Sequence, residues 1–206
     1  MEELELPAGV EAVIFDCDGT LADTMPLHYR AWAETLALTG VEMSEALFYE
    51  LGGVATEEIV LILNARHGCQ LPVVETAAAK ERRYEELLPQ APAIRPVVTL
   101  ARALCGRMPL AVASGGIRRL VDKTLAALEL THCFQAIRTT EDVAHGKPAP
   151  DLFLSAAEAL GIPPERCLVY EDSDLGLEAA RRAGMQWMDV RPIVEAERAA
   201  LEQHRG

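Results

Sequence analysis

Four separated segments of the chain carry residue types that can transfer a phosphoryl group. They are Asp16-Cys17-Asp18-Gly19-Thr20, Ser114-Gly115, Lys147-Pro148 and Glu171-Asp172. A carboxylate can act as a nucleophile or exchange a proton, and hydroxyl, N–H and ammonium groups can hold a phosphate. Each short motif is weak alone, but the four together predict one phosphoryl-transfer site.

The first segment is expected to place two carboxylates on one face. The mostly apolar run Val10–Phe15 predicts a buried strand. Residues two apart on an extended backbone point the same way, so Asp16 and Asp18 should share one side while Cys17 points into the core. Buried and unpaired carboxylates are costly, so a divalent cation or backbone N–H groups must offset their charge.

Two simpler interpretations of this segment are an EF-hand calcium loop and an ordinary turn. An EF-hand calcium loop that starts at Asp16 needs glycine at its sixth position and glutamate at its twelfth. The chain has Leu21 and Leu27 there, which excludes the calcium loop. An ordinary turn stays open for the segment in isolation, because Asp and Gly both favour turns.

The fourth segment favours a metal site. The run Cys167–Tyr170 predicts a strand, and Leu175–Ala183 predicts a helix. A residue between the two runs can cap that helix, but capping does not account for Glu171 and Asp172, which come earlier. A few hard oxygen ligands suit Mg²⁺, which usually retains water and binds substrate phosphate.

The two middle segments offer contacts for a phosphate. Pro109–Ala113 predicts a strand and residues 117–128 a helix, so Ser114 and Gly115 lie in a turn whose free N–H groups can bind an anion. An ordinary connecting loop is the alternative. Lys147 lies between glycine and proline residues that fix the backbone, although most lysines are simply solvated.

The order of the expected elements predicts an α/β fold that helices interrupt. No convincing strand occurs between Ala22 and Pro89, and afterwards helices alternate with strands, as in a parallel sheet. The expected helices of the insert are Leu27–Thr39, Ser44–Leu51, Thr56–His67 and Val74–Leu88. Two further strands are expected at Phe134–Arg138 and Gln186–Val190. We expect a Rossmann-like parallel-sheet core at residues 1–22 and 90–206, with an inserted all-helical cap at residues 23–89. Ligands of such sheets bind beyond the carboxyl ends of the strands, where the four segments fall.

Charge and length restrict the possible partners. The 206 residues carry a net charge of −13, and 50% of them are hydrophobic, which is enough for a substantial core. The negative charge argues against binding to nucleic acid or anionic membranes, and no apolar run approaches membrane-spanning length. The acidic start of the chain, with Glu2, Glu3 and Glu5, is unlike a signal peptide. We therefore expect a cytoplasmic monomer.

The cysteines predict a reducing environment. They are Cys17, Cys69, Cys105, Cys133 and Cys167. Their odd number and scattered positions indicate reduced, mostly buried thiols rather than a disulfide framework. Cys17 neighbours the candidate nucleophile, but its expected orientation toward the core makes it a packing residue.

In order and spacing, the four segments resemble the motifs of the haloacid dehalogenase superfamily across nearly the whole chain. The string Lys147–Phe153 is also similar to the branch with a helical cap after the first motif, which includes β-phosphoglucomutase and many sugar-phosphate phosphatases. The strings Val169–Gly176 and Met188–Arg191 look similar to fructose-1-phosphate phosphatase-like members.

This resemblance implies a Mg²⁺-dependent phosphatase that hydrolyses a small phosphorylated metabolite, a sugar phosphate, through an aspartyl-phosphate intermediate. It implies that Asp16 is the nucleophile and Asp18 the general acid and base. Lys147 is the third implied catalytic residue and would hold the phosphate together with Ser114. The other implied phosphate- and substrate-binding residues are Gly115, Thr20 and His28. The implied metal ligands are Asp16, the main-chain carbonyl of Asp18, and Asp172, with Glu171 as a ligand or as a neighbour of the ligands. A carboxyl group at Asp18 favours phosphate chemistry over halide removal, which needs no such acid.

The resemblance also implies the geometry of two side chains. The peptide bond between Lys147 and Pro148 should be cis, with the lysine amine within salt-bridge reach of Asp16. His28 should face the active site, the alternative being a packed surface histidine. Trp32, one helical turn later, is expected in the core of the cap.

Two other functions remain possible. β-Phosphoglucomutases carry an arginine soon after a Gly-Val pair in the cap, whereas Thr56 follows Gly53 and Val54 at the matching place here. Their cap lysine has no clear counterpart near residues 83–86. A bidentate arginine is hard to replace as a phosphate ligand, so a phosphatase is favoured over β-phosphoglucomutase. A catalytically idle phosphometabolite-binding protein is the third possibility, against which the two intact aspartates of the first segment argue.

Overall fold

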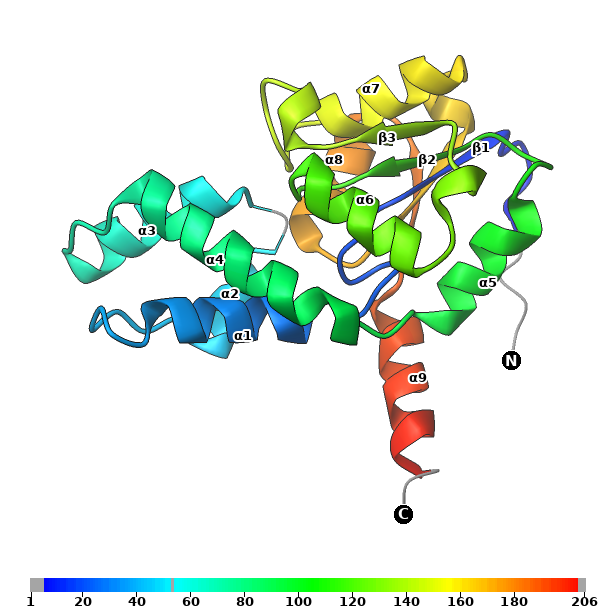
Figure 1. The fold of residues 1–206 in the computed structure, drawn as a ribbon. Helices are drawn as coiled ribbons and strands as arrows, with labels where there is room; N and C mark the ends of the chain where they lie inside the picture. The colour runs from blue at the N-terminus through cyan, green and yellow to red at the C-terminus, as the bar shows by residue number, and fades with distance from the viewer. Residues whose placement is uncertain (1–5, 53, 204–206) are drawn as a thin grey trace.

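The structure of the chain, a computed structural model, describes residues 6–52 and 54–203. Glu2, Glu3, Glu5 and Gly53, which entered the sequence analysis, lie outside the described residues. The described chain forms an α/β body, and a group of helices from the first half of the chain lies to one side of it (Figure 1).

A parallel sheet forms the centre of the described chain. Its strands are β1 (Ala12–Phe15), β2 (Leu110–Ala113), β3 (Ala136–Arg138), β4 (Cys167–Glu171) and β5 (Gln186–Asp189). They lie in the order β3-β2-β1-β4-β5, and all neighbours are parallel. Phe15 of β1 is in register with Val112 of β2 and Tyr170 of β4, so the carboxyl ends of these strands meet at one edge.

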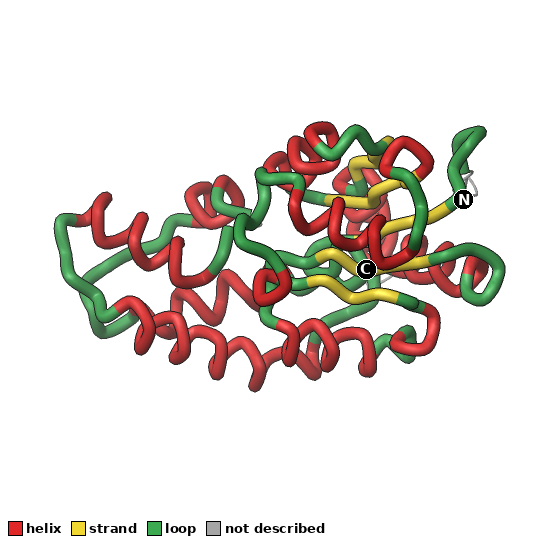
Figure 2. Tube along the Cα trace, turned by 90° about the horizontal axis from the view of Figure 1, so that it is seen from above, coloured by secondary structure: helices red, strands yellow, loops and turns green. Residues whose placement is uncertain are grey.

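Helices cover both faces of this sheet. The covering helices are α5 (Arg95–Leu104), α6 (Arg118–Ala127), α7 (Asp151–Leu160) and α8 (Asp174–Arg182). Val13 and Phe15 of β1 pack into the apolar cluster formed with α5 and α6, whereas Ala12 and Ile14 pack into the cluster formed with α7 and α8. The alternation follows from the two-residue period of a strand, and Figure 2 shows the strands lying between helices. The predicted Rossmann-like α/β core is confirmed.

The insert after β1 is helical, as predicted. It contains α1 (Met25–Leu36), α2 (Glu45–Glu50), α3 (Thr56–His67) and α4 (Val73–Leu87). These helices enclose an apolar cluster of their own, in which Trp32 is buried as expected. An apolar cluster separate from that of the sheet supports the division into core and cap, although the predicted bounds at residues 23 and 89 stay predictions.

The remaining elements are short 3₁₀ turns and a last helix. The turns are η1 (Leu88–Gln90), η2 (Thr131–Cys133), η3 (Thr140–Asp142) and η4 (Pro164–Arg166), and the helix is α9 (Arg191–Gln203). Arg198 of α9 donates to the carboxylate of Asp23, which ties this helix to the start of the cap. Among the described residues, no helix combines the length and the apolar character needed to cross a membrane.

The prediction that all cysteines are free thiols is wrong. Cys105, which follows α5, forms a disulfide with Cys133 in η2, and their Cα atoms lie 4.8 Å apart. The two residues are distant in sequence and meet only because α5 and η2 pack on the same face of the sheet, so their spacing gave no sign of the bond. Cys17, Cys69 and Cys167 are free, and Cys17 is buried in the core as predicted.

Candidate active site

The carboxyl end of β1 carries the two aspartates of the first segment. The N–H of Asp16 donates to the carbonyl of Tyr170 at 3.0 Å, which extends the pairing of β1 with β4 and fixes the backbone of Asp16. The Asp16 side chain is buried, and Asp18 is partly buried. The strand pairing thus determines where the candidate nucleophile lies.

Gly19 allows the first segment to lie directly against the fourth. Its φ of 90° is in the left-handed region that favours glycine. A Cβ atom at this position would lie 2.1 Å from Oδ2 of Asp172. The hydroxyl of Thr20 donates to Oδ1 of the same carboxylate at 3.2 Å. Thr20, predicted as a phosphate contact, therefore orients Asp172 in this structure.

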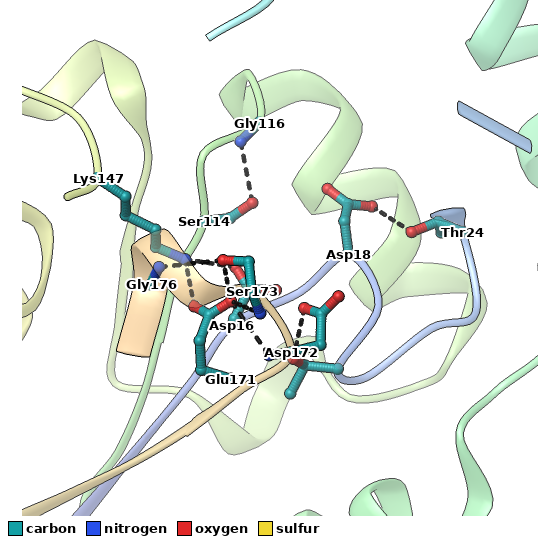
Figure 3. Close-up of polar contacts among 11 residues, drawn as sticks. Asp16, Asp18, Thr24, Ser114, Gly116, Lys147, Glu171, Asp172, Ser173 and Gly176 are labelled. Carbon is teal, nitrogen blue, oxygen red and sulfur yellow. Dashed lines mark hydrogen bonds and ion pairs between the residues drawn. The ribbon is translucent and has the colours of Figure 1, made fainter. Parts of the chain in front are cut away.

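Lys147 lies between two carboxylates (Figure 3). Its Nζ atom is 2.7 Å from Oδ1 of Asp16 and 2.7 Å from Oε2 of Glu171. The side chain is 1% exposed, and the Phe153 ring centroid lies 5.1 Å from the ammonium. The peptide bond to Pro148 is cis. The cis bond and the contact with Asp16 agree with the prediction, and the contact with Glu171 is additional.

Glu171 is engaged through both of its carboxylate oxygens. Besides the Lys147 contact at Oε2, its Oε1 accepts hydrogen bonds from the N–H of Asp172 and from the N–H and hydroxyl of Ser173, at 3.1, 2.9 and 2.8 Å. Helix α8 approaches so closely that a Cβ atom on Gly176 would lie 2.1 Å from the Glu171 carboxyl carbon. Asp16 and Asp172 are consequently the better placed carboxylates for a cation.

Asp16, Glu171 and Asp172 form an acidic cluster that could hold a metal ion. One carboxylate oxygen from each lies within 4.8 Å of the others. The cluster has three carboxylates and the single ammonium of Lys147, which contacts two of them, so carboxyl groups outnumber positive charges. A set of oxygen donors suits a hard cation such as Mg²⁺.

The buried charges of the cluster shift one another's pKa values. Burial and the negative charge of Glu171 raise the pKa of Asp16 to about 7, although Lys147 lowers it. Burial, Glu171 and Asp16 likewise raise the pKa of Asp172 well above its ordinary range. Burial disfavours the charged form of Lys147, but the two carboxylates outweigh it and raise the lysine pKa. Additional positive charge is therefore needed before every carboxyl group ionises readily.

Asp18 lies in a different environment. Burial alone would raise its pKa, but hydrogen bonds and charge from His28, Thr24 and Tyr84 outweigh burial and lower the pKa to about 2. The hydroxyls of Thr24 and Tyr84 donate to its Oδ1 at 2.8 and 3.1 Å, and Nε2 of His28 lies 3.5 Å from the same atom. The two aspartates thus have pKa values shifted in opposite directions, as is typical of carboxylates with different roles.

Ser114 and Gly115 lie at the carboxyl end of β2. The Ser114 hydroxyl is buried and accepts a hydrogen bond from the N–H of Gly116 at 3.0 Å. Both residues line the same cavity as Asp16 and Lys147. The structure therefore brings all four predicted segments together at one edge of the sheet.

The cap contributes side chains from α1 and α4. His28 stacks on the Tyr84 ring with centroids 3.6 Å apart, and its Nδ1 lies 2.8 Å from Nζ of Lys80. Burial and the nearby Lys80 charge lower the pKa of His28, which favours the neutral imidazole. The predicted orientation of His28 toward the active site is what the structure shows.

A cavity of about 90 Å³ lies between the sheet edge and the cap. The cap residues that line it include His28, Trp32, Thr56, Lys80, Glu81 and Tyr84. Pockets for drug-sized ligands measure roughly 300–1,000 Å³. The enclosed space therefore suits a small molecule that the cap covers.

The family model for haloacid dehalogenase-like hydrolases matches residues 10–184. The chain belongs to this family. Fructose-1-phosphate phosphatase YqaB from Escherichia coli is 36% identical over 87% of this chain and 95% of its own. The phosphorylated carbohydrates phosphatase of Thermotoga maritima is 32% identical over 86% and 83%. A crystal structure of CbbY from Rhodobacter sphaeroides in complex with phosphate has a TM-score of 0.77 at 31% identity, over 86% of this chain and 84% of that one.

These similarities confirm the predicted superfamily and the prediction that this haloacid dehalogenase-like hydrolase is a phosphoric monoester hydrolase. They do not test the roles of individual residues. The roles predicted for Asp16, Asp18, Lys147 and the other site residues therefore stay predictions.

Two charged cap residues that line the cavity of this hydrolase, Lys80 and Glu81, were not predicted from the sequence. Residues 83–86 offer no cap lysine, whereas the buried Lys80 lies one turn earlier. Its Nζ donates to Oε1 of Glu81 at 3.0 Å and lies 5.8 Å from the Trp32 ring centroid. The helical periodicity of the sequence could have identified Lys80, because this lysine falls in the stripe of residues that α4 buries. The stripe consists of Ala77, Lys80, Tyr84 and Leu87.

Proposed function

We propose that this hydrolase is a Mg²⁺-dependent phosphatase that hydrolyses a sugar phosphate through an aspartyl-phosphate intermediate. The observation that carries the proposal is the placement of Asp16 beside Lys147 and the acidic cluster, with Asp18 two residues later under the cap. The similarity to a fructose-1-phosphate phosphatase and to a phosphorylated carbohydrates phosphatase supports a sugar phosphate as substrate.

The proposed reaction has two displacements at phosphorus. A carboxylate oxygen of Asp16 attacks, the bond from phosphorus to the sugar oxygen breaks, and Asp18 gives its proton to that oxygen. Water then attacks the aspartyl phosphate and passes a proton to Asp18, and the bond to Asp16 breaks to release phosphate. Nearby negative charge raises the pKa of a carboxyl group, so a bound phosphate favours the protonated Asp18 that the first step needs.

Lys147 and Ser114 would hold the transferring group. The ammonium lies against Asp16, and Ser114 lines the same cavity with the turn of Gly115 and Gly116. Phosphoryl transfer depends mostly on positioning and on neutralising charge. These side chains would therefore fix the phosphate in line with the Asp16 oxygen.

The acidic cluster fits Mg²⁺ on the grounds of its oxygen donors and its excess of carboxyl groups over positive charges. We propose that Asp16, Asp172 and the main-chain carbonyl of Asp18 hold the ion. Glu171, which Lys147 and the start of α8 already engage, would position its neighbours. When bound, Mg²⁺ neutralises charge on the transferring phosphoryl group.

Binding of Mg²⁺ is expected to weaken in acid. Because the pKa of Asp16 is raised to about 7, this carboxyl group holds a proton below that pH, and a cation must displace it. The dissociation constant should rise by roughly tenfold per pH unit below 7 for each displaced proton. Calorimetric titrations between pH 5.5 and 8.5, in two buffers of different ionisation enthalpy, measure both the affinity and the released protons. An affinity that stays constant across this range would contradict the proposed metal site.

A substrate panel tests the proposed function. Phosphate release from sugar phosphates and from p-nitrophenyl phosphate should require Mg²⁺ and disappear with EDTA. A catalytically idle phosphometabolite-binding protein would release no phosphate from any of these compounds, so detectable turnover rules out that alternative.

A separate assay distinguishes the phosphatase from β-phosphoglucomutase. Thr56, at the place of the mutase arginine, is hydrogen-bonded to Glu81 and offers no positive charge to a second phosphate. With β-glucose 1-phosphate and a catalytic amount of glucose 1,6-bisphosphate, we expect phosphate release to exceed formation of glucose 6-phosphate. A coupled dehydrogenase assay measures glucose 6-phosphate, and its faster formation would favour the mutase.

The proposal includes three further properties of the phosphatase. We propose that the phosphatase is monomeric, acts in the cytoplasm and does not bind nucleic acid. The net charge of −13 supports the last of these, because it would repel a polyanion.

A further inference from the structure

Glu81 of α4 lies where the active-site cavity meets a second, wider cavity. The second cavity has a volume of about 620 Å³ and shares Thr56, Glu81 and Gly115 with the first. Asp16 and Lys147 line only the active-site cavity, here called the inner cavity. A substrate whose phosphate lies beside Asp16, and which is too long for the inner cavity, would therefore extend its other end past Glu81.

The carboxylate of Glu81 is fixed through one oxygen. Its Oε1 accepts hydrogen bonds from the hydroxyl of Thr56 and from Nζ of Lys80. Its Oε2 has no hydrogen-bond partner among residues 6–52 and 54–203, and the side chain is 14% exposed. Burial would raise the pKa of Glu81, but Lys80 and Thr56 outweigh burial and lower it. Glu81 is consequently a charged acceptor with one oxygen available at the junction.

The cap supplies no excess positive charge at this junction. The Lys80 ammonium lies 3.0 Å from Oε1 of Glu81 and 2.8 Å from Nδ1 of His28. Lys80 is therefore held at Oε1 of Glu81 and at His28, and Oε2 of Glu81 is the charged oxygen of this group that has no partner among the described residues. A first phosphate meets Lys147, whereas a second phosphate at the far end would meet the Glu81 carboxylate.

The wider cavity does not reverse this charge pattern. Two of its lining residues, Arg82 and Arg119, are cationic, and three, Glu57, Glu81 and Glu141, are acidic. Arg119 is paired with a further carboxylate, that of Glu85. The lining as a whole is therefore better matched to neutral hydroxyl groups than to a second phosphate.

We propose that Glu81 selects substrates whose end remote from the phosphate is an uncharged polyhydroxyl group. Oε2 accepts a hydrogen bond from a substrate hydroxyl, and the negative charge rejects a second anionic group. A hydrogen bond to a charged acceptor favours the monophosphate by roughly 10- to 100-fold. This selection rests on the proposed phosphatase function and narrows its substrates to sugar monophosphates.

Inhibition of p-nitrophenyl phosphate hydrolysis tests the selection. Fructose 1-phosphate and fructose 1,6-bisphosphate compete with the chromogenic substrate, and the ratio of their inhibition constants reports discrimination against the second phosphate. We expect the unaltered protein to bind the monophosphate at least about tenfold more tightly, and Glu81→Gln to shrink this ratio by about tenfold or more. Glu75→Gln, an exposed glutamate on the same helix, removes the same charge and should keep the original ratio.

A charge-preserving variant separates repulsion from hydrogen bonding. Glu81→Asp keeps the negative charge but withdraws the oxygen, so it should still reject the bisphosphate while binding the monophosphate more weakly. This variant also decides the question if Glu81→Gln fails to fold, as judged by circular dichroism and thermal melting. Acceptance of the bisphosphate by Glu81→Asp would then overturn the proposal.

Two outcomes distinguish the selection from the function on which it rests. If the unaltered protein hydrolyses neither p-nitrophenyl phosphate nor any sugar phosphate, the proposed phosphatase itself fails. If hydrolysis is robust but folded Glu81→Gln discriminates as the unaltered protein does, only the role of Glu81 is overturned.

Discussion

Replacing Asp16 with asparagine is expected to abolish multiple turnover. The amide is a poor nucleophile toward phosphorus, and the change removes one of the carboxylates that would bind Mg²⁺. Removal of a hydrolase nucleophile lowers kcat by on the order of 10⁶-fold in a well-studied case, and we expect at least about 10⁴-fold here. Steady-state phosphate release at saturating Mg²⁺ measures the loss.

Two further variants define what this loss means. Asp18→Asn should also block turnover but leave Mg²⁺ binding largely intact, because the proposed metal contact at Asp18 is its main-chain carbonyl. Asp122→Asn, on the exposed face of α6, makes the same chemical change and should retain normal activity. Normal multiple turnover in Asp16→Asn would contradict the proposed mechanism.

The strands and the place of the site were predictable because their signals are local. Short apolar runs such as Cys167–Tyr170 can be buried on both sides only within a covered parallel sheet. The strands of such a sheet end at a shared edge, so motifs directly after β1, β2 and β4 had to lie close together. The prediction that Lys147 reaches Asp16 depended instead on the family resemblance, since its loop does not directly follow a strand of the sheet.

The cap contacts were harder to predict because they join faces of different helices. Lys80 lies in a stripe of α4 that packs toward α1, and its partner His28 is 52 residues away in sequence. Periodicity shows that a lysine falls on a buried stripe, but not what lies opposite it. Glu81 was missed for the same reason, because its role at the junction depends on Thr56 at the start of α3.

The electrostatic difference between the two aspartates also requires the structure. Asp16 and Asp18 have the same side chain and follow the same strand, so their sequence suggests similar acidity. Burial and Glu171 raise the pKa of Asp16, whereas His28, Thr24 and Tyr84 outweigh burial and lower that of Asp18. Two of these partners, His28 and Tyr84, belong to the cap helices, so packing of the cap against the sheet edge helps to determine the acidity of Asp18.

Replacing Lys147 with alanine is expected to lower kcat by about a hundredfold or more. Its ammonium lies 2.7 Å from both Asp16 and Glu171, and its side chain is 1% exposed, so solvent screens its positive charge little. Loss of a buried electrostatic stabiliser typically lowers kcat by 10²- to 10³-fold. Removing one partner of a buried ion pair also costs about 3–5 kcal/mol of stability, which bound Mg²⁺ should partly offset. Phosphate-release kinetics and thermal melting with and without Mg²⁺ measure the two effects.

The variant Lys147→Met separates charge from packing at this position. Methionine has a long, unbranched and uncharged side chain, so it should restore much of the packing beside Phe153 while still failing to neutralise Asp16 and the phosphate. We therefore expect Lys147→Met to be more stable than Lys147→Ala but equally impaired in kcat. Lys123→Ala, which removes an exposed lysine from α6, should change neither quantity appreciably. A folded Lys147→Met that keeps kcat within a few-fold of the original would show that Lys147 acts in packing alone, and it would remove this residue from the catalytic set.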